Sequence, residues 1–155
     1  MENLENGYSM FNGCKKLSSF NYNLPKLTNG RRMFNGCSSL EEFLIDISSV
    51  QDGYDMFQNC PKLRKFTSKL TSLTGGQWMF FASKLDKDSV INIITSLKED
   101  NICDTGSPLL YIGIDRNLAT DSELLAFLGI SSGTNQTITV TNPKGINWAV
   151  SLYWN

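Results

Sequence analysis

The chain of 155 residues contains no histidine, and only 19% of its residues are charged. The missing imidazole removes the commonest general base and the commonest metal ligand together. Glycine-rich phosphate loops, the G-x-S-x-G elbow and the H-E-x-x-H motif do not occur either. The sequence therefore predicts a protein that is not an enzyme and that uses no cofactor and no metal.

Strong net charge and long apolar runs are lacking as well. The net charge at pH 7 is −1, so no global field attracts nucleic acid or an anionic membrane. No apolar run approaches the roughly 18–20 residues that a membrane-spanning helix needs. The first residues carry Glu2 and Glu5, where a signal peptide has a basic segment. We expect no nucleic-acid partner and no membrane insertion.

What the sequence does contain is one phrase repeated at a fixed interval. MFNGC stands at 10–14 and again at 33–37, MFQNC follows at 56–60, and a divergent copy, WMFFAS, occupies 78–83. A period between about 20 and 50 residues is typical of a solenoid, in which each unit buries its apolar face by stacking on its neighbours. The columns that keep the 23-residue interval include Met10, Met33, Met56 and Met79, then Cys14, Cys37 and Cys60, then Phe20, Phe43 and Phe66.

Within a unit, the spacing suggests one coil of a repeat. A glycine preceded by Asn or Asp closes a turn, and we expect Met-Phe to lie on a short helical turn. Cys-x-x-Leu-x-x-Phe then leads into a short strand, and stacked units place these strands in a parallel sheet. Opposite charges support this register, because it sets Glu41 beside Arg64, Glu42 beside Lys65 and Asp46 beside Lys69.

The run MFNGCSSLEEFLIDISSVQDGYDMFQNCPKLRKF resembles the BspA-like leucine-rich repeats of bacterial surface proteins, in the M-F-x-x-C-x-x-L-x-x-F variant of gut bacteria and their phages. The resemblance covers residues 4–85, and the tail is similar to segments that close such arrays. It implies an α/β fold: a short leucine-rich-repeat solenoid with a parallel sheet, capped by helices and a C-terminal β-hairpin. Members of the family are mostly binding or structural proteins.

The repeat lattice fails at Leu85, which predicts an array over residues 1–85 and a C-terminal capping region over 86–155. Asp86 or Asp88 is expected to cap a helix that extends to about residue 100. Residues 107–115 read as a strand that extends the sheet as its fourth rung. A capping box at Thr120 to Glu123 opens a helix that ends at Leu128. The alternating segments 137–141 and 146–154 predict a hairpin that either caps the array or docks onto another subunit.

The three cysteines of the repeat should stack in one column. Three thiolates could hold a soft metal, but no C-x-x-C pair occurs and Ser83 takes the place of cysteine in the fourth unit. We therefore interpret Cys14, Cys37 and Cys60 as structural thiols. Unpaired cysteines also favour assembly in a reducing compartment.

Any binding site should lie on the exposed face of the strands. Its outward residues run from neutral to acidic to basic, and Leu44 is the one apolar side chain among them. The aromatic candidates for the surface, Tyr8, Tyr54, Trp78, Tyr153 and Trp154, lie elsewhere, and about half of them should be core. The predicted binding residues are Asn21, Asn23, Glu42, Leu44, Asp46, Lys65, Thr67 and Lys69, and the residues predicted to act in assembly are Trp148, Tyr153 and Trp154.

The expected function is a non-enzymatic structural or interaction module. The first hypothesis is a phage virion component, such as a fibre, tail or capsid-surface protein, assembled in the bacterial cytoplasm. An array that opens in mid-unit at Leu4 suits a subunit covered by a partner, or a fragment of a longer protein. The alternative is part of a secreted or cell-surface bacterial adhesin. The expected partners are other protein subunits, including copies of the chain, or a cell-surface ligand.

Overall fold

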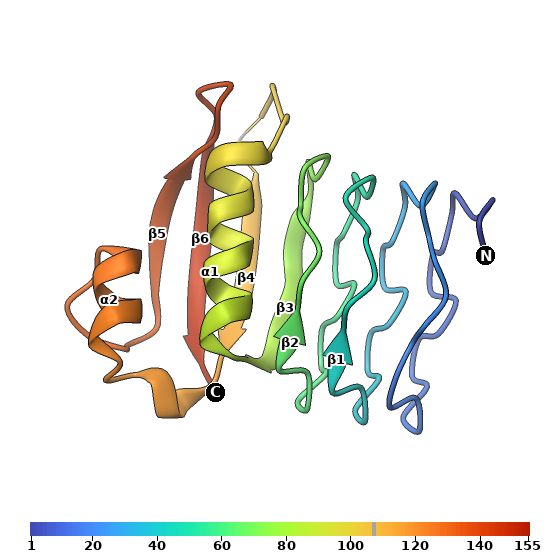
Figure 1. The fold of residues 1–155 in the computed structure, drawn as a ribbon, viewed down its shortest axis with the longest axis horizontal. Coiled ribbons are helices and arrows are strands. Elements are labelled where there is room, and N and C mark those ends of the chain that lie inside the picture. The colour runs from blue at the N-terminus through green and yellow to red at the C-terminus, as the bar shows by residue number, and fades with distance from the viewer. Residues whose placement is uncertain (107) are drawn as a thin grey trace.

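The computed structural model describes residues 1–106 and 108–155. Its N-terminal half is a stack of coils, each one repeat long (Figure 1). Parallel bridges join Asn6 to Asn29, Asn29 to Asp52 and Asp52 to Gly75, one from each coil to the next. The predicted 23-residue lattice is therefore the spacing of the coils.

Two short strands form the small parallel sheet of the repeats. β1 (Glu42–Phe43) pairs with β2 (Lys65–Phe66), and Glu42 lies opposite Lys65 as the repeat predicted. The first coil contributes no strand within the described chain, although the N–H of Glu41 donates to the carbonyl of Ser18 at 3.3 Å. The predicted strands are thus present in the second and third coils.

The prediction of a helical turn at Met-Phe is wrong. The N–H of Phe11 donates to the carbonyl of Met33 at 2.8 Å, and Phe34 bonds in the same way to Met56 at 2.9 Å. An α-helix would direct these N–H groups back along their own coil. Here they join one coil to the next, and in the fourth coil the same segment forms β3 (Gly76–Leu85).

The larger sheet grows from β3. Its strand order is β3-β4-β6-β5. β3, β4 (Leu109–Ile114) and β6 (Asn147–Trp154) run parallel to one another, and β5 (Gln136–Thr141) runs antiparallel to β6. The predicted strand over 107–115 is confirmed for 109–114, and Ser107 lies outside the described residues. It extends the Gly-Met-Phe side of the stack, however, and not the β1–β2 sheet. The predicted hairpin is present and completes this sheet.

Helices flank the sheet. Asp86 caps α1 (Lys87–Thr95) by accepting from the N–H of Ser89, and a π-helical turn, η1 (Ser96–Asp100), continues it. The 3-10 turn η2 (Arg116–Leu118) precedes α2 (Ser122–Leu128). Asp121 caps α2, where the predicted box placed Thr120, and Gly129 ends it in the left-handed region at φ 69°.

Helix α1 closes the edge of the small sheet. The hydroxyl of Ser89 accepts from the N–H of Phe66 at 2.8 Å and donates to the carbonyl of Arg64 at 3.1 Å. A serine side chain therefore satisfies the groups that a further strand would have bonded. The repeat sheet ends at β2, whereas the larger sheet continues on the other side of the coil.

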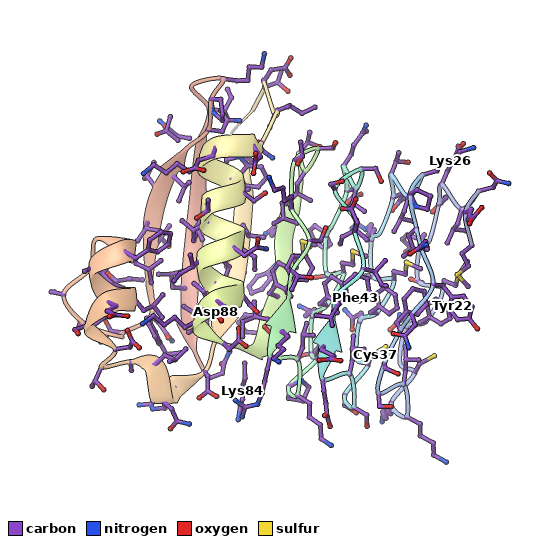
Figure 2. All side chains as sticks on the ribbon, in the orientation of Figure 1. Tyr22, Lys26, Cys37, Phe43, Lys84 and Asp88 are labelled. Atoms are coloured by element: carbon purple, nitrogen blue, oxygen red, sulfur yellow. The ribbon has the colours of Figure 1, made fainter. Side chains whose placement is uncertain are left out.

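The core is one continuous cluster that passes through residue 85. Phe11, Phe34, Phe57 and Phe80 stack with ring centroids 5.4–5.6 Å apart. Phe43 points into the stack between the coils (Figure 2). The α/β architecture is confirmed. In residues 1–106 and 108–155, no helix has the length and apolar character to cross a membrane.

Candidate binding surfaces

The residues predicted to bind a ligand all lie exposed on the β1–β2 side of the stack. Leu44, Asp46, Thr67 and Lys69 line one shallow groove of about 320 Å³. Lys65 and Thr67 line a second groove of about 330 Å³, whose far wall is the first turn of α1. Asn21, Asn23 and Glu42 line neither of these two grooves. The structure therefore gathers five of the predicted residues along two grooves that share Thr67, and leaves Asn21, Asn23 and Glu42 outside them.

The predicted charge pairs across this face are replaced by other ion pairs. Lys69 pairs with Asp100 at 3.0 Å and Arg64 with Asp115 at 2.5 Å. Asp46 accepts instead from the main chain and hydroxyl of Ser48 at 2.9 and 3.2 Å. Repeat spacing sets Cα positions, whereas long side chains reach partners in the C-terminal half.

The face of the larger sheet that points away from α1 carries aromatic side chains that stack from strand to strand. Trp78 of β3 stacks on Tyr111 of β4 with centroids 4.2 Å apart and planes at 15°. Tyr111 stacks in turn on Tyr153 of β6 at 5.7 Å and 20°. Phe81 meets both Trp78 and Tyr153 edge-on, each at 5.0 Å. We call these four residues the aromatic ladder.

The ladder is partly exposed because its strands alternate. Tyr111 lies between buried Leu110 and Ile112, and Tyr153 between buried Leu152 and Trp154. The buried side chains face the core and α1, which lies across β4 and β6 in Figure 1. The ladder therefore faces away from α1 and presents ring edges to solvent, since its ring faces stack on one another.

A groove of about 440 Å³ lies beside the ladder, on the side of the repeat coils. It is lined by residues that include Arg31, Tyr54, Gln77 and Leu109. The guanidinium of Arg31 lies 4.1 Å from the ring centroid of Tyr54, in cation–π contact. The ladder and this groove together concentrate Trp, Tyr and Arg, the side chains that dominate binding hot spots.

One ladder residue, Trp78, lies at a left-handed position of the repeat. Trp78 has φ 61° and Ala82 has φ 60°. The equivalent positions of earlier coils share this conformation, with Asp55 at 57° and Asn59 at 58°. The turn geometry is thus fixed by the repeat, and the fourth coil places aromatic residues where earlier coils have polar ones.

The sequence contains a signal for Phe81 that the comparison of apolar repeat positions does not use. Its column holds Asn12, Asn35 and Gln58 before it, so Phe81 breaks a polar column in the same coil as Trp78. Tyr111 has no comparable signal, because its strand reads LLYIGI and carries no polar alternation. The pairing of β4 with β3 places it beside Trp78.

The residues predicted to act in assembly divide between core and surface. Trp148 and Trp154 are buried within the chain, where their indole N–H groups donate to Asn101 at 3.3 Å and to the carbonyl of Thr134 at 3.0 Å. Tyr153 belongs to the ladder and keeps an exposed edge. A role in assembly stays a prediction for all three residues. Of the three, Tyr153 is the one whose side chain is partly exposed to a partner.

The cysteine column is free of disulfides, and its two buried thiols bond to the main chain. The Sγ of Cys37 donates to the carbonyl of Phe11, and that of Cys60 to the carbonyl of Phe34, each at 3.2 Å. Burial raises the pKa of Cys37 to about 11 and that of Cys60 to about 12, so both thiols are neutral at pH 7. Across residues 1–106 and 108–155, no three metal-ligating side chains gather as a site.

Comparison with known proteins gives one match. No curated protein and no solved structure is similar to the chain. The model of the BspA type leucine rich repeat region (6 copies) matches residues 4–107. This match covers more than half of the chain and all of the coils described above. Leucine-rich-repeat domains generally serve as non-enzymatic, protein-binding modules. The chain therefore belongs to the BspA-type leucine-rich-repeat family.

Proposed function

We propose that the chain is a non-enzymatic binding module that engages a protein partner through the aromatic ladder. The observation that supports this most directly is the partly exposed set of Trp78, Phe81, Tyr111 and Tyr153 on one sheet face. Rigid aromatic side chains bury much area at little entropic cost, and Trp and Tyr are enriched in hot spots. The sequence-predicted face offers only Leu44 as an apolar anchor.

The setting that we propose for the module is a phage virion, as a fibre, tail or capsid-surface protein in assembly or host attachment. The free cysteines support it, because particles assembled in a reducing compartment keep their thiols unpaired. The alternative is an adhesin fragment, which the typical surface location of BspA-type proteins favours. Sequencing the DNA around the reading frame separates the two. Packaging and tail genes support the virion, and an upstream signal peptide with further repeats supports the adhesin.

Adherence of the purified full chain to bacterial cells tests which face binds. The ladder variant is Trp78→Ala with Tyr111→Ala, and the matched variant for the sequence-predicted face is Lys65→Glu with Lys69→Glu. Loss of adherence in the ladder variant alone supports the proposed surface. Loss in the charge-reversal variant alone transfers the site to the β1–β2 face. Equal adherence of both variants and the parent contradicts both surfaces.

We further infer that the coils form a short open solenoid with an array over 1–85 and a capping region over 86–155. Pairing of β6 with β4 supports a closing role for the hairpin. Self-association through the partly exposed Tyr153 is the corresponding prediction for a homo-oligomer, and sedimentation velocity of the parent and a Tyr153→Ala variant tests it.

A further inference from the structure

Strand β5 forms an open edge of the larger sheet. It lies last in the order β3-β4-β6-β5, on the side of the sheet far from the coils (Figure 1). At the other end of this sheet, β3 accepts from the third coil, for example at 2.8 Å from the N–H of Phe57 to the carbonyl of Met79. The edge of β2 is closed by Ser89. The fold therefore covers these two edges and leaves β5 available.

The register of β5 shows which of its main-chain groups point outward. The N–H groups of Ala149 and Asn155 donate to carbonyls on the β4 side at 3.0 and 2.8 Å. The intervening residues of β6 therefore bond to β5, where their partners are Gln136, Ile138 and Val140. The outward N–H and carbonyl groups consequently belong to Thr137, Thr139 and Thr141. Within residues 1–106 and 108–155, no other main-chain group bonds to them.

The edge carries none of the features that keep a sheet edge from pairing. β5 reads QTITVT, so it contains neither a charge nor a proline. Its register with β6 is continuous from Gln136 to Thr141, without a bulge. Proteins usually protect an open edge with lysine, proline or a bulge, because its N–H and carbonyl groups invite another strand. The composition of β5 therefore favours pairing.

A second copy of the chain fits this edge and leaves none of its outward groups unpaired. When two copies of β5 run antiparallel about a two-fold axis at Thr139, Thr137 of each copy faces Thr141 of the other. All three outward N–H and carbonyl groups of each strand then meet partners. Any slip of this register pairs at least one threonine with a residue outside β5. Residues 129–143 carry no charge, so the strands set no like charges opposite each other.

The threonine side chains suit the same register. The hydroxyls of Thr137 and Thr141 already bond to side chains of β6, at 2.8 and 2.7 Å. Thr139 lies opposite Ala149, whose methyl group offers no hydrogen bond. At the axis, the hydroxyl of Thr139 meets its own equivalent, and such a cross-strand threonine pair stabilises antiparallel strands.

Apolar side chains lie on the other side of the same strand. A groove of about 300 Å³ borders β5 on the α1 side, and its lining includes Phe127, Leu128 and Ile138. Phe127 is 43% exposed. In the two-fold register, Ile138 of one copy lies opposite Val140 of the other, at the closer spacing of a non-hydrogen-bonded pair. Lys98, also in the groove lining, is exposed and keeps its charge in water. The pairing therefore covers apolar surface as well as main-chain groups.

We propose that β5 pairs antiparallel with β5 of a second copy, so that the two four-stranded sheets join about a two-fold axis at Thr139. The axis stands perpendicular to the sheet, so the aromatic ladders of both copies lie on the same face. This inference does not rest on binding by the ladder. It also differs from self-association through Tyr153, which lies on β6 and not at the edge.

Sedimentation velocity of the full chain under reducing conditions tests the pairing. Thr139→Lys and Thr139→Glu each set two like charges against each other at the axis, so each should raise the dimer dissociation constant by about tenfold or more. An equimolar mixture of the two variants sets an ammonium against a carboxylate and should dimerise again. Thr67→Lys, at an exposed threonine on the β1–β2 side, is the matched control and should sediment as the parent does.

A second variant removes the hydrogen bond without adding charge. Thr139→Pro deletes an outward N–H that β6 does not use, so it should weaken the dimer while the hairpin stays folded. Circular dichroism verifies the fold of each variant, and the charged pair keeps the test decisive if proline disrupts the hairpin.

Three results would overturn the proposal. The first is a parent that stays monomeric at about 100 μM. The second is a dimer that every Thr139 variant leaves intact, and if Tyr153→Ala dissociates that dimer, the contact lies on the ladder. The third is a mixture of the charged variants that fails to restore the dimer, because β5 would then meet a different surface of its partner.

Discussion

The side chain of Asn142 donates a hydrogen bond of 3.0 Å to the Oδ1 of Asn101, a buried residue that directly follows η1. The same oxygen accepts from the indole of Trp148 at 3.3 Å, and the amide nitrogen of Asn101 donates to the carbonyls of Leu70 and Leu73 at 2.8 and 2.9 Å. One buried amide therefore ties the third coil to the C-terminal hairpin.

Replacing Asn101 with alanine should destabilise the protein by about 3–4 kcal/mol, because several buried donors and acceptors lose their partner at once. Asn142→Ala should add little in the double variant, since the two side chains share one network. Urea unfolding of the single and double variants measures both effects. Asn147→Ala, at an exposed position of β6, is the control and should change stability by less than about 0.5 kcal/mol. Equal stability of Asn101→Ala and this control would contradict the role of the network.

The two buried thiols should make stability fall at alkaline pH. Burial holds the pKa of Cys37 at about 11 and that of Cys60 at about 12, above the ordinary value of 9.0. Below pH 9 both states keep the protons, whereas above it the unfolded thiols lose protons that the folded ones retain, so unfolding becomes easier. Between pH 8 and 10 the parent should lose about 1–3 kcal/mol more than a Cys37→Ser, Cys60→Ser variant. Parallel urea titrations at both pH values measure the difference, and identical losses would contradict it.

The repeat could be predicted from the sequence because the same residue types recur at a constant interval along the chain. A 23-residue interval in glycine, methionine, cysteine and phenylalanine fixes which residues lie above one another, and Glu42 lies opposite Lys65 as expected. Local conformation at Met-Phe could not be predicted in the same way. At Met-Phe, main-chain hydrogen bonds between coils form in place of helical ones. The residue types at equivalent repeat positions do not show in which direction a main-chain N–H group points.

The candidate site was harder to predict because it depends on pairing between distant segments. Trp78, Tyr153 and Trp154 are equal candidates for the surface in the sequence, but Trp154 is core because strand alternation turns it inward. Tyr111 joins Trp78 only through pairing of β4 with β3. The residues that gather on the sequence-predicted face, such as Leu44 and Lys69, come from neighbouring coils, where the repeat itself dictates proximity.

The left-handed positions of the repeat predict opposite effects for two reciprocal substitutions. Gly13 has φ 72° and open space where a Cβ would lie, and Ala82 has φ 60° at the equivalent place in the fourth coil. A side chain in this region is strained, so Gly13→Ala should cost about 1 kcal/mol and Ala82→Gly should gain about 0.5–1 kcal/mol. Thermal unfolding measures both. Shifts of the same sign would show that packing, and not backbone conformation, decides these positions.

The contact between Ser89 and the edge of β2 predicts that removing the Ser89 hydroxyl lowers stability and promotes association. Ser89→Ala removes the acceptor for the N–H of Phe66 and the donor to the carbonyl of Arg64. The loss should cost about 1–3 kcal/mol, because the buried N–H of Phe66 loses its acceptor, whereas the carbonyl of Arg64 keeps the bond of 2.9 Å from the N–H of Asp86. The uncovered strand edge should also promote association with other chains, so light scattering should rise with protein concentration. Ser122→Ala, at the exposed start of α2, is the matched control and should show neither change. Reduced stability without association would mean that α1 still covers the edge by its bulk, and unchanged stability would show that the serine is not the closing group.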